Sequence, residues 1–152
     1  MEQEAAEDLL NQVRFGPEPD TAMGLKLAVR EHLKVLADPL AHLVQELAED
    51  KGRLLLLYGD ALVSISINPP GAEVSLETRS LAGAYVSLAQ TSVRTGGARA
   101  SLNAAWSFVF PMGDAIEIKG TIANDVLDDA ETFARQLAGQ VGHSVFASPR
   151  TS

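Results

Sequence analysis

The chain has 152 residues, 46% of them hydrophobic, and its 20 acidic and 12 basic side chains give a formal net charge of −8. This length is typical of one domain, and folding at this size buries roughly 70% of the surface that the unfolded chain exposes. Because the sequence has no cysteine, disulfide frameworks, thiolate metal sites, iron–sulfur clusters and cysteine nucleophiles are excluded. The net negative charge argues against a broad grip on nucleic acid or anionic lipid, which depends on summed Lys and Arg charge.

The N-terminal residues and the longest aliphatic run bear on localisation. Residues 1–8 are acidic and lack the basic and apolar regions of a secretory signal. The longest aliphatic run, Leu54 to Leu57, is far shorter than the roughly 18 apolar residues that suggest a membrane span. We therefore expect a cytoplasmic protein with no membrane partner.

Three helices are predicted in the first third of the chain. Apolar residues recur at helical spacing within residues 2–13 and 25–36. Asp38 followed by Pro39 is typical of a helix start, because aspartate caps free amide groups and proline has no amide hydrogen to leave unpaired. We expect a third helix, or a slightly bent pair of helices, from here to Gly52, with a buried stripe made by Leu40, Leu43, Val44 and Leu47.

After Gly52 the apolar residues recur at every second position, which predicts strands. Six strands are expected, at residues 53–58, 61–68, 72–79, 84–93, 102–110 and 115–122. The connections are short and rich in turn residues, as in Gly59-Asp60 and Pro69-Pro70-Gly71, which indicates an antiparallel meander. A closing amphipathic helix is expected to begin at Asn124 or Asp125 and to stop at Gly142.

The order of these elements predicts an α+β fold. It consists of N-terminal helices, a six-stranded antiparallel meander and a C-terminal amphipathic helix packed on the sheet. We expect a single domain over residues 1–147, with helices in 2–51, the meander in 53–122 and the closing helix in 125–141, followed by a flexible tail in 148–152. The element order is similar to that of the helix-grip fold, in which a sheet curls round a C-terminal helix. A pleckstrin-like barrel capped by its last helix is the alternative architecture.

No group of residues in the sequence predicts a catalytic, metal or cofactor site. Asp38, His42 and Glu46 would share one face of the third helix, but a helix cap and a solvated ion pair account for the two acids. Ser144 next to His143 is no catalytic pair, because adjacent side chains point apart. We therefore expect no cofactor and no metal, and an enzyme of unknown type that uses carboxylates and His42 is the third functional hypothesis.

One face of the predicted sheet is uncharged. The inward face is expected to carry Trp106, Phe108 and Phe110 together with Val63, Ile65, Ile67, Val86 and Leu88. The opposite face then presents only small side chains, namely Ser64, Ser66, Ser87, Ala89, Thr91, Ala105 and Ser107. Because a solvated sheet face normally carries Lys, Glu or Arg, we expect this face to be covered by the N-terminal helices, by a partner or by a second copy.

Charge is unevenly distributed along the chain. Residues 1–50 contain 4 basic and 11 acidic side chains, whereas residues 79–113 contain three arginines, Arg79, Arg94 and Arg99, and no acid. This stretch is suited to contact with an anion or an acidic partner. Three arginines are too few for nucleic acid, and the aromatic residues that would stack on bases are predicted to lie in the core.

The leading functional hypothesis is a non-enzymatic protein-interaction module, adaptor or chaperone-like. It would bind a protein partner or its own copy through the uncharged sheet face or an edge strand. The candidate partner-binding residues are Ser64, Ser66, Ser87, Thr91, Ser107, Arg94 and Arg99. The second hypothesis is a carrier of a small apolar ligand, in a cavity between the sheet and the closing helix lined by Trp106, Phe108, Phe110, Phe133 and Leu137.

Overall fold

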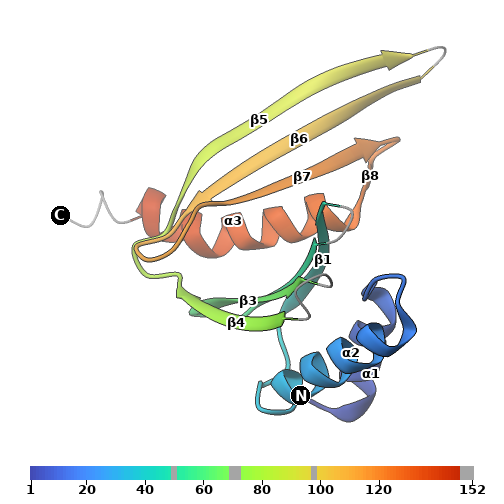
Figure 1. Ribbon diagram of the computed structural model, residues 1–152. Helices are drawn as coiled ribbons and strands as arrows, with labels where there is room; N and C mark the ends of the chain where they lie inside the picture. Colours follow the sequence, from blue (N-terminus) through green and yellow to red (C-terminus); the bar gives the residue numbers. More distant parts are fainter. Residues whose placement is uncertain (49–50, 69–72, 97–98, 148–152) are drawn as a thin grey trace. The chain divides into compact units, whose positions relative to one another are not determined.

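The computed structural model describes residues 1–48, 51–68, 73–96 and 99–147, which form three helices and two antiparallel sheets of four strands each (Figure 1). The α+β class predicted from the sequence is confirmed. The six-stranded meander is wrong, because eight strands divide between two sheets. The chain forms two compact units, Met1–Tyr58 with Leu62–Thr78, and Gly59–Ala61 with Arg79–Ser152, and each is described by itself. The single domain over residues 1–147 stays a prediction.

The first unit begins with the two helices expected from the helical spacing, α1 (Gln3–Gln12) and α2 (Pro19–Lys34). Their buried side chains are Ala6, Leu9, Leu10, Leu25, Val29 and Leu33. The two helices are also joined by an ion pair, in which Arg30 Nη2 lies 2.8 Å from Glu7 Oε1. Both helices therefore place their apolar stripes in one core.

The predicted third helix is wrong, and a strand takes its place. β1 (Ala41–Ala48) pairs antiparallel with β2 (Lys51–Leu57), with Val44 opposite Leu54 and Leu43 opposite Leu55. Asp38 caps no helix, and its Oδ1 accepts a hydrogen bond from the Glu2 amide at 3.2 Å.

The physical reason is that β1 has apolar residues on both of its faces. Leu43 is buried on one face and Val44 packs on the other against the cluster of α1 and α2. A pair of adjacent apolar residues is therefore compatible with a strand that packs on both of its faces as well as with an amphipathic helix. Leu40 and Leu47, expected in the helix stripe, are more than half exposed.

The first sheet has the order β1-β2-β3-β4, where β3 is Ala61–Asn68 and β4 is Glu73–Ser80. One of its faces packs against α1 and α2 through Leu54, Leu56, Val63, Ile65 and Ile67, with Val44, Val74 and Leu76 at the margin. Val63, Ile65 and Ile67 of β3 are buried, but against α1 and α2 and not on one sheet face with Trp106, Phe108 and Phe110, which belong to the second unit. The turn expected at residues 69–71 lies outside the described residues.

The second sheet has the order β5-β6-β7-β8, and α3 runs along one face of it (Figure 1). Its strands are β5 (Tyr85–Gly96), β6 (Arg99–Val109), β7 (Ile116–Ala123) and β8 (Val126–Leu127). The core between this sheet and α3 (Asp129–Ala147) contains Phe108, Ile116, Ile118, Phe133, Ala134, Leu137 and Val141. We call the face under α3 the helix side and the opposite face the open side.

The predicted ends of the closing helix are both wrong. Asn124 and Asp125 do not start the helix but have positive φ angles of 53° and 62°, and they form the turn between β7 and β8. Asn and Asp tolerate this left-handed conformation, which two-residue hairpin turns require. The helix starts at Asp129 and continues past Gly142 to Ala147. The tail expected at residues 148–152 lies outside the described part of the chain.

Candidate interaction surface

β5 is the exposed edge of the second sheet. Within the described residues it pairs with β6 alone, so the backbone groups on its other side meet no strand. The strand is 12 residues long, contains no proline and no acid, and carries Arg94 as its one charge. Every side chain from residue 87 to residue 95 is exposed, including Leu88 at 47% and Val93 at 68%.

A β-bulge divides β5 near its start. Val86 lies opposite Phe108, but Leu88 lies opposite Ser107, so Ser87 is an extra residue without its own partner position on β6. The Ser87 hydroxyl donates a hydrogen bond to the Ser107 carbonyl oxygen at 3.2 Å. Because the extra residue shifts the alternation by one, Leu88 lies on the open side with Ser107, whereas the sequence predicted that it faces inward.

The strand register shows which residues of the second sheet lie on each face, because directly opposite residues of antiparallel strands share a face. Three rows of opposite residues on the open side are Gln90, Ala105 and Lys119; Ser92, Asn103 and Thr121; and Arg94, Ser101 and Ala123. The rows on the helix side include Ala89, Trp106 and Ile118, then Thr91, Ala104 and Gly120. Thr91 and Ala89 therefore lie on the helix side, away from Ser107.

The residues predicted to make one uncharged face are divided between the two sheets. Ser64 and Ser66 belong to β3, opposite Leu55 and Arg53, and Ser64 is buried. Of the other candidates, Ser107 is half-buried on the open side, while Thr91 and Arg94 are exposed. Arg99 opens β6 opposite Gly96. The structure thus places Ser87, Thr91, Arg94, Arg99 and Ser107 in the second sheet and Ser64 and Ser66 in the first. Thr91 lies on the helix side of the second sheet, whereas Arg94 and Ser107 lie on its open side.

The open side contains a shallow polar hollow of about 430 Å³. Its lining combines four amide or hydroxyl side chains, one lysine and one aspartate with three small residues, namely Gln90, Ser92, Asn103, Thr121, Lys119, Asp128, Ala104, Ala105 and Gly120. Lys119 Nζ lies 3.4 Å from Glu117 Oε1, and both side chains are exposed. The hollow offers hydrogen-bond donors and acceptors to side chains of a strand laid beside β5.

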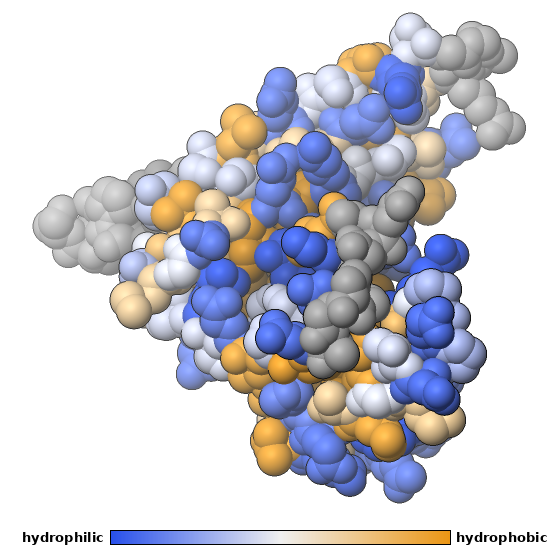
Figure 2. All heavy atoms as spheres, in the orientation of Figure 1, coloured by the Kyte–Doolittle hydropathy of each residue, from blue (hydrophilic) through white to orange (hydrophobic). Residues whose placement is uncertain are grey.

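An apolar row crosses the helix side next to the start of α3. Val93, Leu102, Ile122 and Leu127 lie opposite one another across four strands. Leu102 and Ile122 are half-buried, and Leu127 is 39% exposed. Figure 2 shows hydrophobic (orange) residues among hydrophilic (blue) ones on the part of the surface formed by β5 and β6.

Buried polar contacts hold α3 against the sheet. Glu131 is fully buried, and its carboxylate accepts hydrogen bonds from Trp106 Nε1 at 3.0 Å and from Arg135 Nε at 2.8 Å. Asp128 caps the helix, with Oδ1 accepting from the Glu131 amide and Oδ2 from the Thr121 amide. The buried carboxylate of Glu131 therefore has a structural role in holding α3 on the sheet.

The residues proposed to line a ligand cavity are packed together. Phe108, Phe133 and Leu137 are at most 1% exposed. Phe110 is buried beneath the Arg79 guanidinium, which lies 5.7 Å from its ring centre, and Trp106 stacks on Phe108 at 6.2 Å. Tight packing of this kind is typical of a core, and the apolar carrier stays a prediction without support from these contacts.

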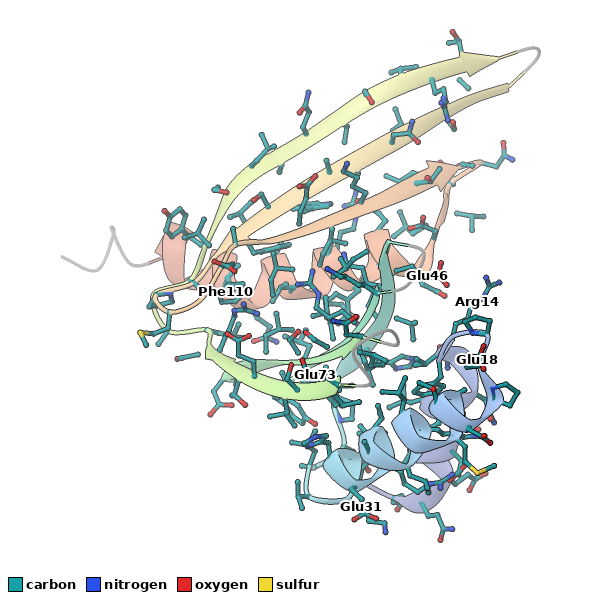
Figure 3. All side chains as sticks on the ribbon, in the orientation of Figure 1. Arg14, Glu18, Glu31, Glu46, Glu73 and Phe110 are labelled. Atoms are coloured by element: carbon teal, nitrogen blue, oxygen red, sulfur yellow. The ribbon has the colours of Figure 1, made fainter. Side chains whose placement is uncertain are left out.

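The three residues considered for catalysis are not gathered on a helix. His42 is exposed on β1, and Glu46 lies 3.7 Å from Arg14 (Figure 3). Among the described residues, no group of three His, Asp or Glu side chains is placed to hold a metal ion. Nor is any helix in the described ranges long and apolar enough to cross a membrane. The side chains of His143 and Ser144 lie outside the described part.

Comparisons with models of known protein families, with curated proteins and with solved structures found no match. The exposed edge of β5 is therefore the main indication of function on the surface of this chain.

Proposed function

We propose that this protein is a non-enzymatic interaction module that binds another polypeptide by strand addition at β5. The observation that supports the proposal is the exposed edge of β5, with its 12 residues, one charge and no proline. A strand of this kind presents a row of backbone donors and acceptors, and an extended polypeptide can complete their hydrogen bonds.

The other edge of the same sheet is protected, which makes the exposure of β5 more significant. β8 is only two residues long, and Asp128 alone separates it from α3. Natural sheets protect their edges by short strands, lysine, proline or bulges. β5 has a bulge at Ser87 only, so the stretch from Leu88 to Gly96 offers an uninterrupted edge for pairing.

Side chains beside β5 supply the selectivity of the proposed module. Gln90 and Ser92 on the open side border the polar hollow that also contains Asn103 and Lys119. Val93 on the helix side begins the apolar row. A partner strand that alternates polar and apolar residues matches both faces at once, and the absence of acids in residues 79–113 favours neutral or acidic partners.

The test is binding of labelled extended peptides to wild-type protein and to edge variants. Val93→Lys and Leu88→Lys place a charge on the edge strand, whereas Met112→Lys makes the same kind of change at an exposed apolar residue in the turn between β6 and β7. We expect peptides that bind wild type and Met112→Lys to lose at least tenfold in affinity for the two edge variants. Equal binding to all four proteins, or no binding of any peptide by a protein that is monomeric under the assay conditions, would refute strand addition at β5.

A further inference from the structure

We infer that the strand that pairs with β5 is β5 of a second copy of this chain, aligned antiparallel about a two-fold axis at Thr91. The inference rests on the proposed function, since it names the occupant of the same edge. Such a pair would join the two second sheets of the copies into one continuous sheet of eight strands, which removes both exposed β5 edges.

The symmetry restricts the possible alignments. A two-fold axis that relates two antiparallel edge strands is perpendicular to the sheet, so it joins open side to open side and helix side to helix side. Directly opposite residues share a face. The axis must therefore lie midway between one residue and the same residue of the second copy, which then lie directly opposite each other. Thr91 and Gln90 are the two positions nearest the middle of β5. An axis at Ser92, the middle of the stretch after the bulge, would place Leu88 opposite Gly96, which has no side chain to cover it.

The side chains favour Thr91 over Gln90 as the centre. With Thr91 at the axis, Val93 lies opposite Ala89 of the second copy on the helix side, and Leu88 lies opposite Arg94 on the open side, where the arginine stem can cover it. Thr91 also meets Thr91, a favourable cross-strand pair. With Gln90 at the axis, the exposed apolar residues Val93 and Leu88 would each lie opposite a serine.

The apolar row of the helix side becomes continuous in the Thr91 alignment. The row that ends at Val93 in one copy would continue through Ala89, Trp106 and Ile118 of the second copy, which lie opposite one another across β5, β6 and β7. Val93, which is 68% exposed in the single chain, would gain Ala89 of the second copy as an apolar neighbour across the unpaired edge of β5. This continuity gives a hydrophobic contribution in addition to the backbone hydrogen bonds.

The charges are compatible with self-association at this edge despite the net charge of −8. Residues 79–113 contain no acid, so β5 does not bring carboxylates of the two copies together. In the Thr91 alignment the two Arg94 residues are six positions apart along the strand, about 20 Å at 3.3 Å per residue, which exceeds the screening length of about 8 Å at physiological salt.

The first experiment is disulfide trapping, for which the absence of native cysteine is an advantage. Under mild oxidation we expect Thr91→Cys to form a covalent dimer, because opposite residues of antiparallel strands are close enough for a disulfide. We expect Gln90→Cys and Met112→Cys to remain uncrosslinked under the same conditions. We also expect a mixture of Gln90→Cys and Ser92→Cys to crosslink, since these positions lie opposite each other in the same alignment.

The second experiment is light scattering during size-exclusion chromatography. We expect wild type and Met112→Lys to have twice the mass of one chain and Val93→Lys to have the mass of one chain, with unchanged circular dichroism and Trp106 fluorescence. Persistence of the dimer in both Val93→Lys and Leu88→Lys would overturn the inference, as would trapping at Gln90 in place of Thr91. A monomeric wild type that still binds peptides at β5 would refute the second copy and leave the proposed function standing. A monomer that binds no peptide would refute both.

Discussion

Gly120 provides the most direct test of how α3 is held on the second sheet. A Cβ atom at this position would lie 2.6 Å from the Glu131 amide nitrogen, 2.8 Å from Asp128 Oδ1 and 2.9 Å from the Glu131 Cα atom. Two of these atoms belong to the backbone of the first turn of α3 and have no room to rotate away. Gly120→Ala must therefore displace the start of the helix.

The size of the effect follows from what the displacement disturbs. Overpacking a close contact costs about 1–3 kcal/mol, and loss of the Asp128 cap adds about 1 kcal/mol. We expect the free energy of unfolding to fall by roughly 2–4 kcal/mol, which lowers Tm by roughly 4–16 °C in a domain of this size. Without the contact, alanine in place of glycine inside a strand would instead raise stability by about 0.5–1 kcal/mol. The close contact therefore predicts a lower free energy of unfolding for Gly120→Ala, and its absence predicts a higher one.

The assay is urea unfolding followed by fluorescence of Trp106, the only tryptophan, and by circular dichroism. Gly139→Ala is the matched control, because Gly139 also belongs to this unit but has no atom within 4 Å of its added Cβ. This helical position should gain about 1 kcal/mol from the same substitution. A Gly120→Ala protein as stable as wild type would refute the close approach, and an equal loss in Gly139→Ala would show that the contact is not the cause.

Three further predictions concern other contacts. Glu131→Ala leaves the indole N–H of the half-buried Trp106 without its acceptor and should lower the free energy of unfolding by about 1–3 kcal/mol. In urea titrations followed by circular dichroism, Glu131→Ala/Trp106→Phe should recover part of this loss, and no recovery would argue against the hydrogen bond. Burial, and then the negative charge of Asp38, raise the pKa of Tyr58 above its usual value of 10.0, so the native state holds this proton more tightly and stability should fall as the pH rises above about 10. In Tyr85→Phe, where Tyr58 is the sole tyrosine, ultraviolet titration should give a higher midpoint for native than for urea-unfolded protein, and equal midpoints would contradict the burial. Gly24→Ala, at a position in α2 with no atom within 4 Å of the added Cβ, should raise Tm through a gain of about 1 kcal/mol, and a lower Tm would indicate an undetected contact.

Alternation of apolar residues located the strands well from the sequence. The predicted segments 61–68, 72–79 and 115–122 correspond to β3, β4 and β7 within one residue at each end. In β7 side-chain alternation coincides with burial on one face. In β3 the apolar residues alternate in the sequence although both faces are buried. Turn residues mark the ends of these segments, so local information is sufficient. The same is true of α1 and α2, whose apolar stripes repeat at helical spacing.

The candidate surface was predicted in part. The sequence indicated an uncharged sheet surface with Arg94 near a hairpin, and an acid-free stretch that includes β5. It did not place Leu88 on the open side, because the bulge at Ser87 arises from the pairing of β5 with β6 and has no signature within β5 itself. It also joined Ser64 and Ser66 to the wrong sheet, because alternation defines faces within a strand and says nothing about which strands become neighbours.

The sequence by itself determined the conformations of α1, α2, β3, β4 and β7, the α+β class and the segregation of charge, because these depend on residues that are close along the chain. Only the tertiary structure decided that residues 41–48 form a strand, that eight strands divide into two sheets and that β5 lies at an edge. Each of these outcomes depends on backbone hydrogen bonds to another strand, and β1 illustrates the point because its apolar spacing fits a helix as well as a two-sided strand. The availability of β2 as a partner, which the spacing within residues 41–48 does not encode, resolves that ambiguity.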